Sequence, residues 1–161
     1  MATLTLSQRQ AVKTDFTVTH AATVFGGRTL AASVLLADWP LLSQYYNQLA
    51  SPTVTLWKPD VQFGDLLKQI VASEAATWTT NQLLLLNVLS NLPIVDATSL
   101  LVRNLFNNIA SGTTISNWSS TSRRSATNLE ALFTTAASGF FTSAVVNQVM
   151  NPDDVYACNI S

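Results

Sequence analysis

The stretch RRSATNLEALFTTAASG (123–139), followed further on by NPDDVYA (151–157), decides the fold of this chain. It is dense in helix-start signals and holds no group of side chains arranged for chemistry. Thr127 and Glu130 stand at the spacing of a capping box, in which each side chain accepts a hydrogen bond from the other residue's backbone N–H. Ser125 is the first candidate for the start of this helix, and the Thr127–Glu130 box is an alternative start two residues later. The stretch therefore predicts a helix that begins at one of these two positions.

A second helix start lies at Asn151. Pro152 fits the first turn of a helix, where its missing N–H costs nothing. Asp153 and Asp154 are favoured next to the positive end of the helix dipole. We interpret these two carboxylates as helix-start residues and not as a catalytic pair, because this position explains both of them.

Caps and apolar repeats predict more helices upstream. They begin near Ser7, Asp38, Asp60 or Gln62, Asn81, Asp96 and Ser116. Residues 53–57 are β-branched and alternating, which is typical of an extended arm or edge strand, and residues 144–150 alternate more weakly. The sequence predicts a mostly α protein: a single helical domain of five to seven helices, with short extended arms or a small β-element near 53–57 and 144–150.

Four consecutive leucines, Leu83, Leu84, Leu85 and Leu86, lie in the segment Asn81–Leu92. A helix that is apolar nearly all round is normally a buried helix. We expect this one to lie in the domain core or in a subunit interface.

Length and charge describe the whole chain. Its 161 residues correspond to one domain, so we expect residues 1–161 to form a single domain. Only 11% of the residues are charged, against about 25% in a typical soluble domain. A surface with so little charge does little to keep monomers apart, which favours a protein that buries part of itself against copies or partners.

Gly112 is expected to end the helix that is predicted to begin at Asp96, because a glycine suits a left-handed C-terminal stop.

Several function classes are disfavoured. The net charge is −1 and the eight basic residues form no stripe, which argues against sequence-specific nucleic-acid binding. The longest apolar runs are far shorter than the ~20 residues of a membrane span. The first ten residues lack the pattern of a signal peptide. We expect a soluble protein made in a reducing compartment.

No catalytic, cofactor-binding or metal-binding residues are predicted, and the chain is not expected to be an enzyme. His20 is the only histidine and is expected in an exposed loop. Cys158 is the only cysteine, so the two together cannot build a zinc site. Gly26 and Gly27 lack the strand, helix and lysine context of a phosphate-binding loop and are expected to form a hinge.

Candidate contact residues come from the arm and from the paired arginines. Trp57 and its neighbour Leu56 lie in the predicted arm, and an aromatic side chain on an arm often anchors in a pocket of a neighbouring subunit. Arg123 and Arg124 suit a solvated helix end or an acidic patch on a partner. The predicted interface residues are therefore Leu56, Trp57, Leu83–Leu86, Arg123 and Arg124.

Part of the chain resembles a family of small proteins encoded in tailed bacteriophages and prophages. The family's C-terminal signature is a basic residue followed by ATRxExLFATGTG and later by a DV helix. The matching residues are Arg124, Ala126, Thr127, Glu130, Leu132, Phe133, Asp154 and Val155. Asn128 replaces the arginine of the signature. Ser51, Pro52, Trp57 and Val61 match a second segment, so the resemblance covers residues 43–157, while residues 1–40 diverge and could form an arm.

The resemblance implies a structural protein of a tailed-phage virion, made in the cytoplasm of the host bacterium. A subunit of the head-to-tail connector is the expected role: a homo-oligomeric adaptor ring that contacts the portal or other neck and tail proteins, and through which DNA could pass. Two alternatives stay open. One is an assembly factor outside the virion, such as a tail chaperone or a scaffold, and the other is a capsid decoration protein.

Overall fold

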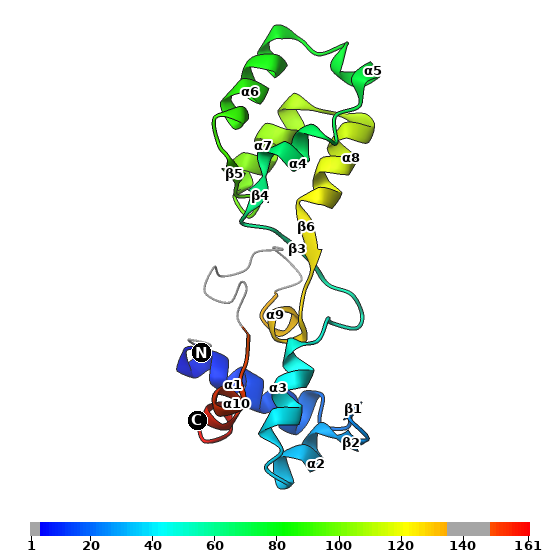
Figure 1. Cartoon of the computed structure of the whole chain (residues 1–161). Helices are drawn as coiled ribbons and strands as arrows, with labels where there is room; N and C mark the ends of the chain where they lie inside the picture. The colour runs from blue at the N-terminus through cyan, green and yellow to red at the C-terminus, as the bar shows by residue number, and fades with distance from the viewer. Residues whose placement is uncertain (1–3, 135–148) are drawn as a thin grey trace. The chain divides into compact units, whose positions relative to one another are not determined.

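The computed structural model describes residues 4–134 and 149–161, which form two compact units (Figure 1). Unit 1 contains the described residues of Met1–Val54 and Ser125–Ser161, and unit 2 is the continuous segment Thr55–Arg124. The described chain holds ten α-helices, one π-helix and short antiparallel strand pairs. The mostly α class expected from the sequence is thus confirmed, while the single domain over residues 1–161 stays a prediction.

The helices outnumber the five to seven expected because several are single turns that leave little apolar periodicity. Four helices of the described chain have six residues or fewer: α2, Leu30–Leu35; α4, Phe63–Leu67; α5, Ala72–Ala75; and α9, Asn128–Leu132. The strand expected near residues 53–57 is present as β3, Thr55–Trp57. The weaker strand expected at 144–150 falls mainly on positions outside the described residues.

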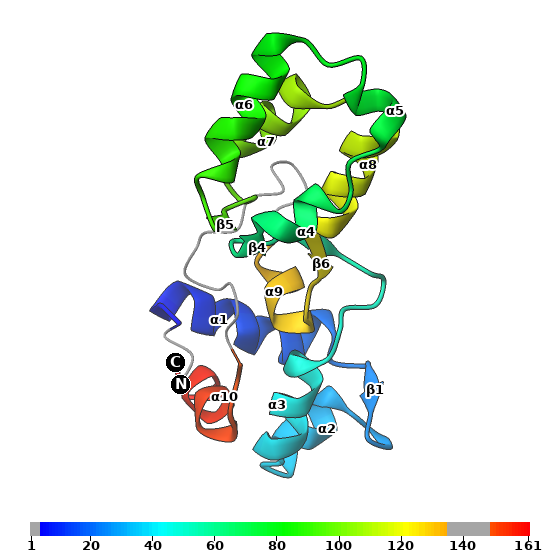
Figure 2. The same ribbon diagram turned by 45° about the horizontal axis from the view of Figure 1, so that its top comes forward.

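Unit 1 is built from both parts of the chain. Besides α2 and α9 it contains α1 (Leu6–Thr14), the π-helix η1 (Asp15–Thr19), β1 (Val24–Phe25), β2 (Arg28–Thr29), α3 (Trp39–Asn47) and α10 (Pro152–Asn159). Figures 1 and 2 both show α10 beside α1, and α10 also packs on α3. The buried core of this unit consists of Leu4, Val12, Phe16, Leu30, Leu42, Tyr46, Leu129, Met150, Val155 and Cys158.

Capping explains where the helices of unit 1 begin. Thr127 and Glu130 form the predicted capping box of α9, so the helix starts there and not at Ser125. Asn151 and Asp154 form a second box at the start of α10. The first helix starts earlier than predicted: Thr5 and not Ser7 is its cap, because a glutamine three residues later completes a capping box with the threonine.

The glycine pair Gly26-Gly27 is a tight turn and not a hinge. Both glycines have positive φ, 58° and 82°, and they join β1 to β2 with Phe25 opposite Arg28. A two-residue hairpin turn of this kind needs φ above zero at both central positions, which glycine adopts without steric cost. The turn brings the chain directly into α2, which Thr29 caps.

Two asparagines fasten the later part of unit 1 to α3. The side chain of Asn47 accepts a hydrogen bond from the backbone N–H of Met150 (2.9 Å) and donates one to its carbonyl (2.7 Å). The side chain of Asn128 donates to the carbonyl of Tyr45 (2.8 Å). The Asn47 bonds satisfy the backbone of Met150, which lies in no helix or strand, and the Asn128 bond adds to the one that the Tyr45 carbonyl accepts from the Gln48 N–H. Together they connect both segments to α3.

Unit 2 contains β3, the short helices α4 and α5, and three longer helices. The longer helices are α6 (Thr80–Ser90), α7 (Leu100–Ile109) and α8 (Gly112–Thr121). Two small strands, β4 (Val61–Gln62) and β5 (Ile94–Val95), pair with each other, and β3 pairs with β6 (Arg123–Ser125). The buried core is Val61, Phe63, Leu66, Leu89, Val95, Ala97, Phe106, Ile109, Ala110 and Trp118.

Two helix starts in unit 2 differ from the prediction. Asp96 does not cap α7; its carboxylate accepts hydrogen bonds from the N–H and hydroxyl of Thr98, which shapes a turn, and α7 begins after Ser99. Gly112 does not end a helix but opens α8, with φ at 56°. The carboxylate of Glu74 occupies the space where a Cβ on this glycine would lie.

Helix α6 is buried on one side only. Leu85, Leu86 and Leu89 recur at helical spacing and pack into the core of unit 2. On the opposite side Leu83 is 50% exposed and Leu84 is 58% exposed. The expected place in the domain core is thus met by the inner side, which α7 covers, while burial of the outer side in a subunit interface stays a prediction. Figures 1 and 2 show α6 and α7 side by side.

Across the part of the chain that the structure describes, no helix has both the length and the apolar character needed to cross a membrane.

Candidate functional site

The predicted arm residue Trp57 lines a pocket of unit 2. Strand β3 places Leu56 and Trp57 on opposite faces, so that Leu56 is buried and Trp57 is half-buried. Backbone bonds hold the strand end on both sides: the N–H of Lys58 donates to the carbonyl of Ser122, and its carbonyl accepts from Ala97. The Lys58 ammonium donates to the carbonyl of Thr121 (2.7 Å). The backbone next to Trp57 is therefore held in place.

Two guanidinium groups lie against this indole. The Arg123 guanidinium carbon is 4.2 Å from the centre of the Trp57 ring, and that of Arg103 is 5.2 Å away. Arg123 comes from β6, the partner of β3, whereas Arg103 comes from α7. An aromatic ring attracts such cations electrostatically. Arg103 also donates to the carbonyls of Ala97 and Thr98, which fixes its side chain.

The pocket has a volume of about 560 Å³ and mixes polar, cationic and apolar walls. Its lining is Trp57, Leu100, Arg103, Asn104, Phe106, Asn107, Ile115, Ser116, Ser119 and Arg123. No carboxylate is among these residues. The electrostatic character of the site is therefore positive, and its chemistry suits recognition of an anion and not proton transfer.

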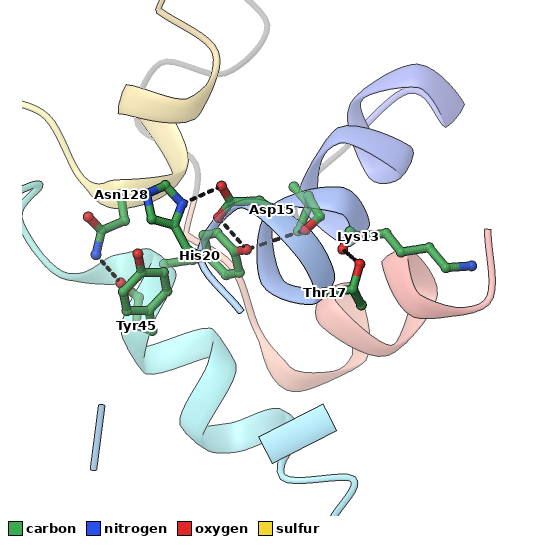
Figure 3. Close-up of polar contacts among 8 residues, drawn as sticks. Lys13, Asp15, Thr17, His20, Tyr45 and Asn128 are labelled. Atoms are coloured by element: carbon green, nitrogen blue, oxygen red, sulfur yellow. Dashed lines mark hydrogen bonds and ion pairs between the residues drawn. The ribbon is translucent and has the colours of Figure 1, made fainter. Parts of the chain in front are cut away.

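A separate polar cluster lies in unit 1 around Asp15 (Figure 3). The Tyr46 hydroxyl donates to one oxygen of this buried carboxylate at 2.9 Å, and His20 Nδ1 lies 2.6 Å from the other. Burial raises the pKa of Tyr46 far above its usual value, and the adjacent Asp15 charge raises it further. The same two causes raise the pKa of Tyr45. His20 lies in an exposed bend, as expected from the sequence, and its side chain, which is 49% exposed, is tied to Asp15.

The Asp15–His20 pair has a structural role in the fold. The backbone N–H of His20 donates to the carbonyl of Asp15 (2.7 Å), so the same two residues close the π-helix η1 through backbone and side chains. A carboxylate can orient an imidazole for general-base catalysis, but a nucleophile must then lie within hydrogen-bond reach. Within the described ranges, 4–134 and 149–161, no hydroxyl or thiol is hydrogen-bonded to His20.

Cys158 and the acidic residues offer no alternative reactive centre. Burial raises the pKa of the Cys158 thiol to about 11, so the sulfur is protonated near neutral pH, and the thiol is a poor nucleophile. No group of three His, Cys, Asp or Glu side chains in the described part of the chain could hold a metal ion.

The structure brings together two of the predicted contact residues, Trp57 and Arg123. Arg124 is half-buried on β6 and engages in interactions of its own. The paired arginines lie on strand β6 and not at a helix end, because α8 ends at Thr121 with Ser122 as its C-cap. Arg103 was not predicted as part of this site, because its approach to the indole depends on how α7 packs. The contact between Asp15 and His20 was not predicted either, because a π-helix brings residues at this spacing together and an ordinary helix does not.

Comparison of the chain with protein-family models, with curated proteins and with solved structures found no match.

Proposed function

We propose that this protein is a structural subunit of a tailed-phage particle, acting by assembly at the junction of head and tail. The proposal places the chain in a homo-oligomeric ring between the portal and the tail. Its phage context depends on the resemblance at residues 43–157. Its mode of action depends on one observation in unit 2, the exposed apolar side of α6.

This surface is defined by three side chains, and we name it the leucine face. They are Leu83 (50% exposed), Leu84 (58%) and Val88 (54%), which lie on the outer side of α6 by helical spacing. Single exposed apolar residues are common on protein surfaces, but several on one helix face are typical of a contact surface. Because only 11% of the chain is charged, little repulsion opposes the approach of a second copy. We propose a second copy of this chain as the occupant.

A charge placed on the leucine face tests this proposal. Leu84→Glu should convert the oligomer to monomer, because a carboxylate buried between two apolar surfaces costs several kcal/mol. The measurement is sedimentation velocity over a range of protein concentrations, with circular dichroism to verify folding. Ser73→Glu adds the same charge at an exposed position at the start of α5 and should leave the oligomer intact. A wild-type protein that stays monomeric at high concentration would contradict the proposal.

The alternatives differ in where the protein is found. A connector subunit is present in purified particles at the copy number of one ring, whereas a decoration protein is present in far more copies. A tail chaperone or scaffold is present in infected cells and missing from particles. Quantitative mass spectrometry of purified virions and of infected-cell lysate separates these three outcomes.

A further inference from the structure

The pocket beside Trp57 concentrates positive charge in a chain that has little of it. Two of the eight basic residues of the chain, Arg103 and Arg123, line this one cavity of about 560 Å³. Its lining contains no acidic residue. Like charges placed close together raise each other's energy, and an anion between them removes that cost. The arrangement therefore favours an anionic occupant.

The two guanidinium groups are held in place before any ligand arrives. Arg123 lies over the indole of Trp57 at 4.2 Å, a contact with the ring face that uses none of its N–H donors. Arg103 is fixed by hydrogen bonds from one nitrogen to two carbonyls. A guanidinium presents its donors as a planar fork that matches a carboxylate. Side chains already ordered lose less conformational entropy on binding.

The remaining walls indicate which kind of anion fits. Asn104 and Asn107 offer amides that can both donate to and accept from a peptide backbone. Leu100, Phe106 and Ile115 offer apolar surface beside them. Nucleic-acid phosphates are normally met by a track of several basic side chains, and this chain has a net charge of −1. A carboxylate on a peptide with apolar neighbours matches the pocket better.

We infer that this pocket binds a carboxylate of a peptide segment from a partner protein, with apolar side chains on either side of it. The carboxylate is an aspartate or glutamate side chain or a C-terminal carboxyl group. Recognition of the carboxylate does not depend on the proposed function. Only the identification of the partner as a neighbouring virion protein rests on it.

Three synthetic peptides test the inference on the full-length protein. The first is a blocked five-residue peptide with a central aspartate between two leucines, and the second carries asparagine in place of the aspartate. The third is the asparagine peptide with a free C-terminal carboxyl group. Binding is followed by NMR shifts of the Trp57 indole N–H and the Arg123 Nε–H. The aspartate peptide, the free-carboxyl peptide or both should bind about tenfold or more tightly than the blocked asparagine peptide.

Matched variants locate the effect in the pocket. Arg123→Gln should weaken binding of the carboxylate peptides to the level of the blocked asparagine peptide. Lys68→Gln removes the same charge from an exposed position in the same unit and should change nothing. Equal binding of all three peptides, no detectable binding of any of them, or the same affinity in Arg123→Gln and Lys68→Gln would overturn the inference.

The two proposals fail in different experiments. Loss of oligomers in Leu84→Glu concerns the leucine face, and that variant should keep its affinity for the carboxylate peptides. A monomeric wild-type protein that still binds these peptides would contradict the proposed ring and support the proposed carboxylate-binding pocket.

Discussion

Asp15 is a carboxylate with 3% of its surface exposed, and the residues around it show how the fold tolerates that burial. A buried charge is costly unless it is hydrogen-bonded. Tyr46 supplies one donor from α3, and the half-exposed His20 supplies a second at the end of η1. Two elements of unit 1, η1 and α3, are thus joined by one carboxylate, because its two oxygens contact His20 at the end of η1 and Tyr46 on α3.

Tyr46→Phe should lower the free energy of unfolding by about 1–3 kcal/mol. The variant keeps the ring and leaves one oxygen of Asp15 buried without its phenol donor. Urea denaturation at pH 7 measures the change. Tyr156→Phe removes a hydroxyl from a tyrosine that is 49% exposed and serves as the control, with an expected change near zero. Equal losses in the two variants would contradict the role given to the Tyr46–Asp15 bond.

Residue-level signals from the sequence were reliable where they depended on neighbours in the chain. The capping box at Thr127 and the helix start at Asn151 were predicted correctly, because both signals depend on residues within one helical turn. The prediction that Asp96 caps a helix was wrong, since an aspartate two residues before a threonine can shape a turn as readily as it can cap a helix. The link between His20 and Asp15 was missed because it requires a π-helix, which leaves no common sequence pattern.

At the scale of elements, the start of α8 depends on a carboxylate from another helix. The Glu74 carboxylate on α5 accepts hydrogen bonds from the backbone N–H groups of Thr113 (2.7 Å) and Thr114 (2.9 Å). These are groups that an α-helix cannot satisfy internally. Hydrogen bonds from the side chain and backbone of Thr114, followed by those from Thr113, lower the pKa of Glu74. The single turn α5 is thereby fastened to a longer helix.

Glu74→Gln should reduce the loss of unfolding free energy that the wild-type protein shows as the pH is lowered. The pKa of Glu74 is lower in the folded protein than its ordinary value of 4.5, so its contribution is present above that value. The contribution is lost as the pH falls through the folded pKa. Denaturation of wild type and variant between pH 2 and 7 should show a difference in unfolding free energy near neutrality that vanishes at low pH. Asp60→Asn, at an exposed position, is the control, and a pH-independent difference for Glu74→Gln would contradict the argument.

The α6 helix shows the limit of apolar pattern as a guide to burial. Its sequence correctly predicted a helix, and its inner side packs as helical spacing requires. How much of an apolar helix is covered depends on how many neighbours the fold supplies, and a local segment does not encode that number. The same reason applies to the pocket. Trp57 and Arg123 were each predicted as contact residues from the sequence, but the contact of the Trp57 ring with Arg123 and Arg103 depends on tertiary packing.

At the scale of the molecule, the division into two units was not predictable from length or composition. Unit 2 is inserted between two parts of unit 1, and its boundaries at Val54–Thr55 and Arg124–Ser125 carry neither glycine nor proline. Pro52 lies two residues before the first boundary, but a single proline there equally fits the end of a helix and does not by itself signal a change of unit. The mostly α class was easier to predict, because caps and apolar spacing indicate helices regardless of where each helix packs in the tertiary structure.

A fragment comprising Thr55–Arg124 should fold without the rest of the chain. It contains a continuous segment with its own buried core, in which Trp118 donates to the carbonyl of Leu66 (2.7 Å) and packs against Phe106. Amide NMR spectra of the fragment should overlay on the corresponding resonances of the full chain. Trp118→Ala in the fragment should abolish that dispersion, since removing a buried tryptophan costs about 3–5 kcal/mol. A fragment without dispersed resonances would show that this core depends on unit 1.

The order in which the core residues of unit 1 occur along the chain has a consequence for synthesis. Val12, Phe16, Leu30 and Leu42 leave the ribosome early, whereas Leu129, Val155 and Cys158, which complete the same core, leave near the end. The whole of Thr55–Arg124 emerges between them. Translation therefore delivers the inserted unit complete while the surrounding unit still waits for its last helix. The nascent chain holds its earliest apolar side chains uncovered for most of its elongation, the interval in which a bound chaperone would protect it.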